Sequence, residues 1–186
     1  MRDIIFDIAV QTNLALPALK LSATMLTIDD APIVQKLLDR CSDYFEVAEG
    51  RPPGPDAALY ELTDGPAERI PHDLFCLGLR PEKGELVGII IVIRHHPLPN
   101  QWYLGLFLLD PAWRGRTCGK ICFFAFENWV ASQGAESILL AVVEPNVRAA
   151  RFWESVGFKL PRCFPSRVMG LRHHVLIEYE KSLIGG

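Results

Sequence analysis

The segment 110–120 carries the clearest chemical signal of the chain. It reads Asp-Pro-Ala-Trp-Arg-Gly-Arg-Thr-Cys-Gly-Lys and leads from an apolar run into a helical pattern. Arg114, Arg116 and Lys120 concentrate positive charge here, although the chain as a whole carries a net charge of −3. Backbone N–H groups at a strand-to-helix junction, with the helix dipole behind them, bind anions such as a pyrophosphate. The segment therefore predicts an anion site, with a basic helix start on a solvated surface as the alternative.

A second informative segment begins at Asn146. Asparagine is a favoured helix N-cap, and apolar residues then recur at i, i+3, i+4 and i+7 in Ala149, Phe152, Trp153 and Val156. Gly157 follows at the position where helices often end in a residue with left-handed backbone conformation. The spacing predicts an amphipathic helix that ends at this glycine.

The two segments together resemble the GNAT superfamily of acyl-CoA N-acyltransferases. Residues 114–119 are similar to the family's phosphate loop, Arg/Gln-x-x-Gly-x-Gly/Ala, and residues 146–158 are similar to its Asn-x-x-Ala-x-x-Phe-Tyr-x-x-x-Gly-Phe segment. In element order the resemblance covers residues 21–180. It implies an α/β fold of the α+β type, with a mixed, mostly antiparallel central sheet flanked by helices and one splayed parallel strand pair.

The resemblance also implies a function and a set of site residues. The expected reaction is transfer of an acetyl or short acyl group from acetyl-CoA, as co-substrate, to a primary amine of a small molecule or peptide by direct attack. The alternative is a non-catalytic CoA-binding or regulatory module of the same fold. Cofactor binding is assigned to Leu106, Phe107, Leu108, Leu109, Arg114, Gly115, Arg116, Thr117, Cys118, Gly119, Lys120, Asn146 and Phe152. Asn146 has a cap role, a ligand role or both.

Two positions depart from the family pattern. Thr117 stands where the family has Gly, and a β-branched residue is disfavoured at positive φ, so we expect a helical φ and a hydroxyl that donates to phosphate. Trp153 stands at the family's Tyr position, where an indole forms a pocket wall and cannot protonate the departing sulfur. Loss of a general acid typically slows a reaction by about 10²- to 10⁴-fold. We therefore predict a slower enzyme.

The base that accepts the amine proton is not identified by any motif. Glu144 is one candidate, because it follows a predicted strand next to the central one, with a solvated loop acid as the alternative. We expect a base that acts through water.

These groups need a scaffold of strands and helices. Gly105 predicts a bulge or close backbone approach in the central strand, with room for a bulky helix residue as the alternative. Prolines at 161 and 165 predict that the stretch before the last strand is broken into shorter pieces. The predicted elements are a strand at 21–27, a helix at 31–44, an antiparallel hairpin of 74–79 and 86–94, a central strand at 102–109, a helix at 117–133, a parallel strand at 137–143 and a last strand at 173–180.

Length and composition fit one globular domain. The chain has 186 residues, of which 49% are hydrophobic and 22% are charged. We expect a single N-acetyltransferase domain over 1–186, with 1–20 as an N-terminal extension and 43–72, rich in proline and glycine, as an acceptor-side loop or lid. With 22 acidic against 19 basic residues, the chain lacks the basic face that nucleic acid binding needs.

Other classes of protein are disfavoured as well. The longest apolar run, Leu86–Ile93, is far shorter than the roughly 20 residues of a membrane span. The 5 cysteines have no close-pair framework and no secretory signal accompanies them, which predicts reduced thiols in a cytoplasmic protein. Adjacent histidines at 95–96 and 173–174 point to opposite faces of a strand, so we expect no metal. The oligomeric state stays open, a homodimer included.

Overall fold

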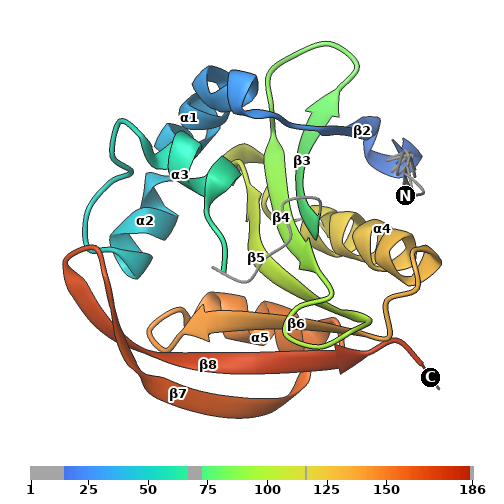
Figure 1. Ribbon diagram of the computed structural model, residues 1–186. Coiled ribbons are helices and arrows are strands. Elements are labelled where there is room, and N and C mark those ends of the chain that lie inside the picture. Colours follow the sequence, from blue (N-terminus) through green and yellow to red (C-terminus); the bar gives the residue numbers. More distant parts are fainter. Residues whose placement is uncertain (1–14, 67–72, 116, 185–186) are drawn as a thin grey trace, which may run out of the picture.

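The computed structural model describes residues 15–66, 73–115 and 117–184 (Figure 1). In this part of the chain, 8 strands form one sheet in the order β1-β2-β3-β4-β5-β6-β8-β7. All neighbouring strands are antiparallel except β5 and β6, which are parallel. This confirms the predicted fold class. The strands are β1 Ala15–Leu16, β2 Leu21–Met25, β3 Leu74–Pro81, β4 Gly88–Arg94, β5 Gln101–Leu109, β6 Ser137–Val143, β7 Lys159–Met169 and β8 Arg172–Ser182.

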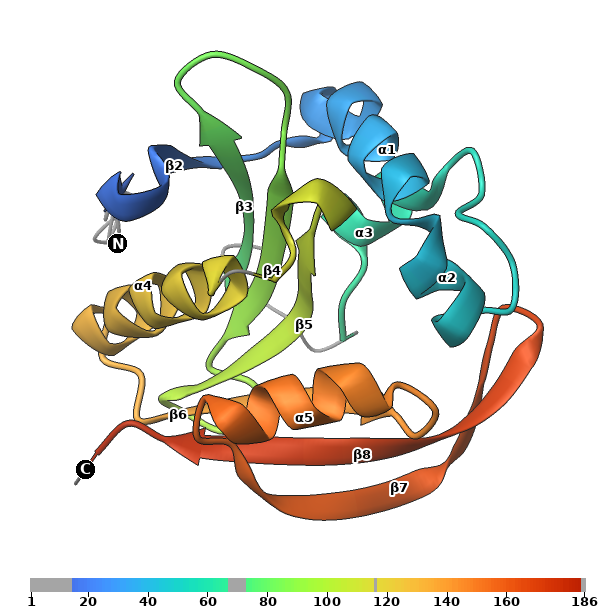
Figure 2. The same cartoon turned by 180° about the vertical axis from the view of Figure 1, so that it is seen from behind.

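Helices cover both faces of the sheet (Figures 1 and 2). One hydrophobic core joins α4 and α5 to the sheet through Phe123, Phe126 and Trp153, and a second joins α1, α2 and α3 through Val34 and Phe45, among others. The two cores place the sheet between two helical layers. The helices are α1 Ala31–Arg40, α2 Ser42–Ala48, α3 Ala57–Thr63, α4 Cys118–Ser132 and α5 Val147–Ser155, with short 3₁₀ turns η1 Pro17–Leu19, η2 Ile28–Asp30 and η4 Pro111–Trp113.

The central strand β5 changes face at Gly105. Val92 of β4 pairs with Leu104, and its neighbour Ile91 pairs with Leu106, so Gly105 is an extra residue on β5. Leu104 consequently packs into the core beneath α4, whereas Leu106 packs into the core beneath α1. Such a bulge bends the strand that carries it.

The bulge is also where β5 leaves its parallel neighbour. Pairing with β6 begins at Gln101 and ends at Leu104, opposite Leu140, and the rest of β5 continues without β6 beside it. A Cβ built on Gly105 would meet only the carbonyl oxygen of Ile91, at 3.8 Å, which is an ordinary contact. The predicted bulge is confirmed, and the alternative that this glycine makes room for a helix side chain is wrong.

Two predicted elements differ in the structure. The helix expected over 31–44 is divided at Cys41, whose φ of −99° and ψ of 24° end α1 before α2 begins. The stretch with Pro161 and Pro165 is one continuous strand, β7, contrary to the expected break. Its register with β8 shifts around each proline, and β7 lies at the edge of the sheet, where a missing N–H is tolerated.

The predicted N-terminal extension and the predicted loop or lid both contain regular structure, and the short helical pattern at 57–62 corresponds to α3. Within 1–20, β1 pairs with β2 and the Leu16 side chain is buried, so the sheet begins here, while residues 1–14 lie outside the described residues. Within 43–72, α2 and α3 pack against α1 and the sheet, and residues 67–72 lie outside the described residues. The described part of segment 43–72 therefore contains two helices.

Candidate active site

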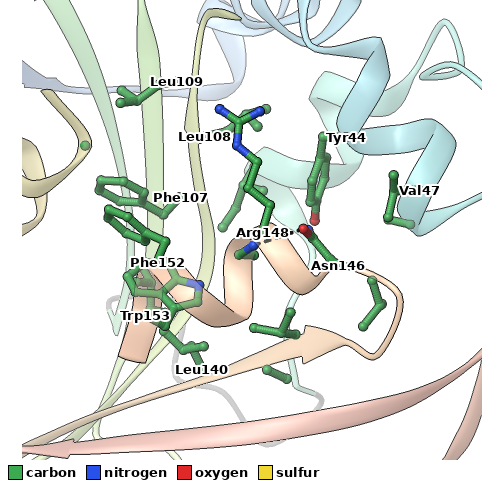
Figure 3. A pocket seen from close by; sticks show the side chains of 18 of the residues that line it. Tyr44, Val47, Phe107, Leu108, Leu109, Leu140, Asn146, Arg148, Phe152 and Trp153 are labelled. Atoms are coloured by element: carbon green, nitrogen blue, oxygen red, sulfur yellow. Dashed lines mark hydrogen bonds between the residues drawn. The ribbon is translucent and has the colours of Figure 1, made fainter. Parts of the chain in front are cut away.

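A cavity of about 850 Å³ opens where β5 and β6 part (Figure 3). It extends from the first turn of α4, past residues 103–109 of β5 and 140–143 of β6, to α2 and the β7–β8 hairpin. Cavities of this size are typical of ligand sites, which usually occupy about 300–1,000 Å³. The gap between the parallel strands is therefore a passage that joins the start of α4 to the opposite side of the sheet.

The loop before α4 forms one end of the cavity. Gly115, Thr117, Gly119 and Lys120 line it, as the anion-site prediction requires. Gly115 has a φ of +79° and Thr117 a φ of +66°, so both residues adopt the left-handed backbone conformation before the helix begins. The expected helical φ at Thr117 is wrong, because the loop needs at this position the conformation that glycine adopts most easily. Arg116 lies outside the described residues.

Arg114 holds this loop against the rest of the protein. Its Nε donates to the carbonyl oxygen of Leu109 at 2.7 Å, and its Nη1 forms an ion pair with Asp43 at the start of α2. Burial lowers the pKa of Arg114, but hydrogen bonding and charge pairing with Asp43 outweigh this and raise it. The side chain predicted to bind the cofactor is thus engaged in fixing the loop to α2.

Asp110 anchors the other end of the loop. Its Oδ2 accepts a hydrogen bond from Nε of Arg40 at 2.5 Å. Its Oδ1 accepts a hydrogen bond from the Ala112 N–H at 2.9 Å, which caps the η4 turn. Burial raises the pKa of Asp110, but the bonds from Arg40 and Ala112 outweigh this and hold it below its usual value. The carboxylate is therefore ionised at neutral pH and keeps the loop attached to α1.

Aromatic rings from β5 and α5 form one wall of the cavity. Phe107 stacks on Phe152 with ring centroids 6.1 Å apart, and Trp153 meets Phe107 edge to face at 5.5 Å. A Cβ on Gly119 would lie 3.2 Å from the Phe152 ring, so this glycine allows α4 and α5 to approach each other. Trp153 is buried among these rings and lines the cavity (Figure 3), as the pocket-wall prediction expects.

Asn146 caps α5 at the lip of the cavity. Its Oδ1 accepts the Ala149 N–H at 3.1 Å, which confirms the predicted capping role. Asn146 also lines the cavity, while Glu144, two residues earlier, is exposed and is not among its lining residues. Of the described residues that line the cavity, Asp43 alone carries a carboxylate, and it is paired with Arg114. A base that acts through water stays a prediction.

The remaining predicted residues fall on either side of the cavity. The four from Leu106 to Leu109 all line it, with Leu106 and Leu108 facing the α1 side and Phe107 and Leu109 facing α4. Cys118 is the first residue of α4, and its N–H donates to the carbonyl oxygen of Gly115 at 3.0 Å. It is not among the lining side chains of the cavity.

Sequence reasoning missed many lining residues, three of which carry a hydroxyl or a guanidinium group. Tyr44 of α2 and Arg148 of α5 direct their side chains into the cavity (Figure 3), and Tyr103 of β5 lines it as well. Burial, with the nearby Glu61 and Glu49 carboxylates, raises the pKa of Tyr44 above its usual value, so its hydroxyl stays protonated at neutral pH. Arg148 occupies a variable position of the Asn-x-x-Ala segment, so the motif gave no signal for it.

A metal site and a membrane-spanning helix are both absent from the described residues. They contain no group of three or more His, Cys, Asp or Glu side chains that could hold a metal ion. In the same residues, no helix has both the length and the apolar character needed to cross a membrane. The five cysteines are free thiols, and burial raises the pKa of Cys122 to about 12, so this thiol stays protonated and packs as an apolar side chain.

Solved structures with the same fold include several acetyltransferases. An acetyltransferase from Thermus thermophilus has a TM-score of 0.68 at 22% identity, covering 88% of this chain and 97% of that chain. A probable GNAT acetyltransferase from Chromobacterium violaceum has a TM-score of 0.72 at 14% identity, covering 88% and 83%. A ribosomal-protein-alanine N-acetyltransferase from Escherichia coli has a TM-score of 0.62 at 15% identity, covering 89% and 96%. At these identities the likeness shows the fold.

The sequence itself gives the family. No curated protein matches the chain. Residues 34–158, more than half of the chain, match the Acetyltransferase (GNAT) family, and this range contains β5, the loop before α4 and the start of α5. This match over more than half of its length shows that the chain belongs to the GNAT acetyltransferase family.

Proposed function

We propose that the protein transfers an acetyl or short acyl group from acyl-CoA to a primary amine. The observation that carries this proposal is the cavity that joins the first turn of α4 to the edge of β5 left open by β6. One end of this passage offers N–H groups for a diphosphate, and the other end is lined by α2 and the β7–β8 hairpin. A donor and an acceptor can thus approach the same point from opposite sides of the sheet.

The residues around the passage fit an acyl-CoA. The first turn of α4, at Gly119 and Lys120, presents N–H groups and the positive end of the helix dipole to a diphosphate. The main chain of β5 beyond Leu104, which β6 no longer pairs, supplies hydrogen-bonding groups for the amides of the pantetheine arm. The carbonyl of Leu109 is already taken by Arg114, so the arm bonds to the strand before this residue.

The chemistry then requires few groups from the protein. The thioester supplies an activated carbonyl carbon; the neutral amine nitrogen forms a C–N bond to it, and the C–S bond breaks. The amine gives one proton to water, and the sulfur leaves with the electron pair and takes a proton from water to become the thiol. A thiol pKa of about 8.5 lets the thiolate leave near neutral pH, so the absence of a Tyr hydroxyl at Trp153 slows the step without preventing it. Main-chain N–H groups of β5 beside the gap stabilise the oxyanion.

Binding and turnover are tested separately. Acetyl-CoA at about 100 times its Kd should stabilise the protein by about 2.7 kcal/mol, which shifts Tm by roughly 5–11 °C for a chain of this size. Thiol release in the presence of an amine panel, with amide formation followed by mass spectrometry, measures transfer. Binding without thiol release for any amine indicates the non-catalytic module. Absence of any Tm shift removes both proposals.

A further inference from the structure

The β7–β8 hairpin closes the acceptor side of the cavity by bonding to the end of α2. The N–H of Leu171, next to the hairpin turn, donates to the carbonyl oxygen of Glu49 at 2.7 Å. The Nε2 of His174, which is 5% exposed, lies 3.0 Å from the carbonyl oxygen of Ala48. Figures 1 and 2 both show the hairpin end beside α2. The hairpin and α2 therefore form one continuous wall.

Gly170 makes this contact close. It has a φ of +57°, and a Cβ at this position would lie 2.6 Å from the Cβ and 2.7 Å from the carbonyl oxygen of Glu49. No other residue type fits both the backbone conformation and the space without a shift of one element. The sequence thus provides, at the tip of the hairpin, the residue that allows its backbone to lie directly against α2.

Behind this wall the acceptor side of the cavity is apolar. Val47 and Ala48 line it from α2, Met169 and Leu176 from the hairpin, and Leu106 from β5. The single carboxylate among the described lining residues, Asp43, is bonded to Arg114. Arg148 of α5, which also lines the cavity, adds positive charge.

We propose that the acceptor is a small apolar monoamine, of the alkylamine or arylalkylamine class. This rests on the proposed acyl transfer. An extended peptide would need an open groove between α2 and the hairpin, where the bonds to Glu49 and Ala48 now lie. A second ammonium group on the acceptor would meet the Arg148 cation and no free carboxylate among the described lining residues. An alkyl or aryl body would instead replace water against apolar side chains.

A kinetic series of acceptors tests this proposal. With saturating acetyl-CoA, kcat/KM should rise about fourfold for each methylene from ethylamine to pentylamine, since a buried CH₂ contributes about 0.8 kcal/mol. Benzylamine should exceed spermidine, free lysine and a short peptide with a free N-terminus by at least tenfold. Equal or higher kcat/KM for the peptide or for spermidine overturns the acceptor class and leaves acyl transfer intact. Thiol release with none of these amines, despite binding of acetyl-CoA, contradicts the proposed function itself.

Two variants test the wall and the lining independently. His174→Ala removes the bond to Ala48 and should raise the ratio of peptide to benzylamine kcat/KM at least threefold, while His173→Ala, at the exposed neighbour, should leave this ratio unchanged. Val47→Asp adds a carboxylate to the lining and should move the preference at least fivefold from pentylamine toward 1,5-diaminopentane. If His174→Ala fails to fold, the Val47→Asp result decides, and unchanged ratios in a folded variant overturn the proposal.

Discussion

Replacing Thr117 first by alanine and then by glycine measures the strain in the loop before α4. Thr117 has φ +66° and ψ −2°, and its side chain is exposed. A left-handed conformation costs an L-residue about 1–2 kcal/mol, and the greater freedom of glycine in the unfolded chain offsets about 0.5–1 kcal/mol of that. The Ala→Gly step should therefore raise the free energy of unfolding by about 0.5–1 kcal/mol. Thermal unfolding should show this as an increase in Tm of about 1–4 °C.

The design separates backbone strain from side-chain contacts. The Thr117→Ala step carries the loss of the contacts that the threonine side chain makes, whereas alanine and glycine differ at this position by one methyl group. Gly115→Ala is the matched control of opposite sign, because Gly115 has a φ of +79° and no atom lies within 4 Å of a Cβ built there. Its cost is therefore conformational, and Tm should fall by a similar amount. A lower Tm for the Ala→Gly step at 117, or a higher Tm for Gly115→Ala, refutes the argument.

The remaining predictions concern one carboxyl group and two residues of the cavity. Burial, followed by the nearby Glu49 and Asp64 carboxylates, raises the pKa of Glu61 to about 7. The stability that the protonated Glu61 carboxyl gives the folded protein is fully present below the unfolded pKa and is lost as pH rises through 7. Glu61→Gln should consequently raise stability at pH 8 by about 1–3 kcal/mol and leave it nearly unchanged at pH 4.5, as measured by urea unfolding. Asn146→Ala should cost about 1 kcal/mol of stability through the lost cap. Asn146→Asp should keep the cap but removes the amide group, so KM for acetyl-CoA should still rise several-fold. Equal KM values for the wild type and Asn146→Asp exclude a contact between the amide group and the pantetheine arm. Arg148→Met removes the cation that the lining presents to a second ammonium group, so it should raise kcat/KM for 1,5-diaminopentane relative to pentylamine about fivefold. Arg151→Met, at an exposed neighbour outside the lining, should leave this ratio unchanged.

The elements beside the cavity could be predicted because their signals are local. Spacing and caps fixed β6 at its observed bounds and α5 within a few residues, and Gly105 indicated the bulge that separates β5 from β6. A glycine inside a strand often marks a bulge or a close backbone approach. The order of these elements then determined the parallel pair.

Contacts between distant segments gave no local signal. The conformation of Thr117 follows from how the loop must turn between β5 and α4, and residue type alone argued against it. The pairing of Arg114 with Asp43 joins residues 71 positions apart, so a cation expected to face the ligand instead fixes the loop. Pro161 and Pro165 predict a break in the chain, but β7 lies at the edge of the sheet, where a proline is tolerated.

The short helix α2 is held at both of its ends. Asp43, in its first turn, bonds to Arg114 of the donor-side loop, and its last residue, Ala48, bonds through its carbonyl to His174 of the acceptor-side hairpin. This helix of seven residues thus sets the distance and angle between the two ends of the passage. In the proposed acyl transfer, the alignment of donor and acceptor depends on how this one helix is attached, so substitutions that detach either end should misalign both substrates.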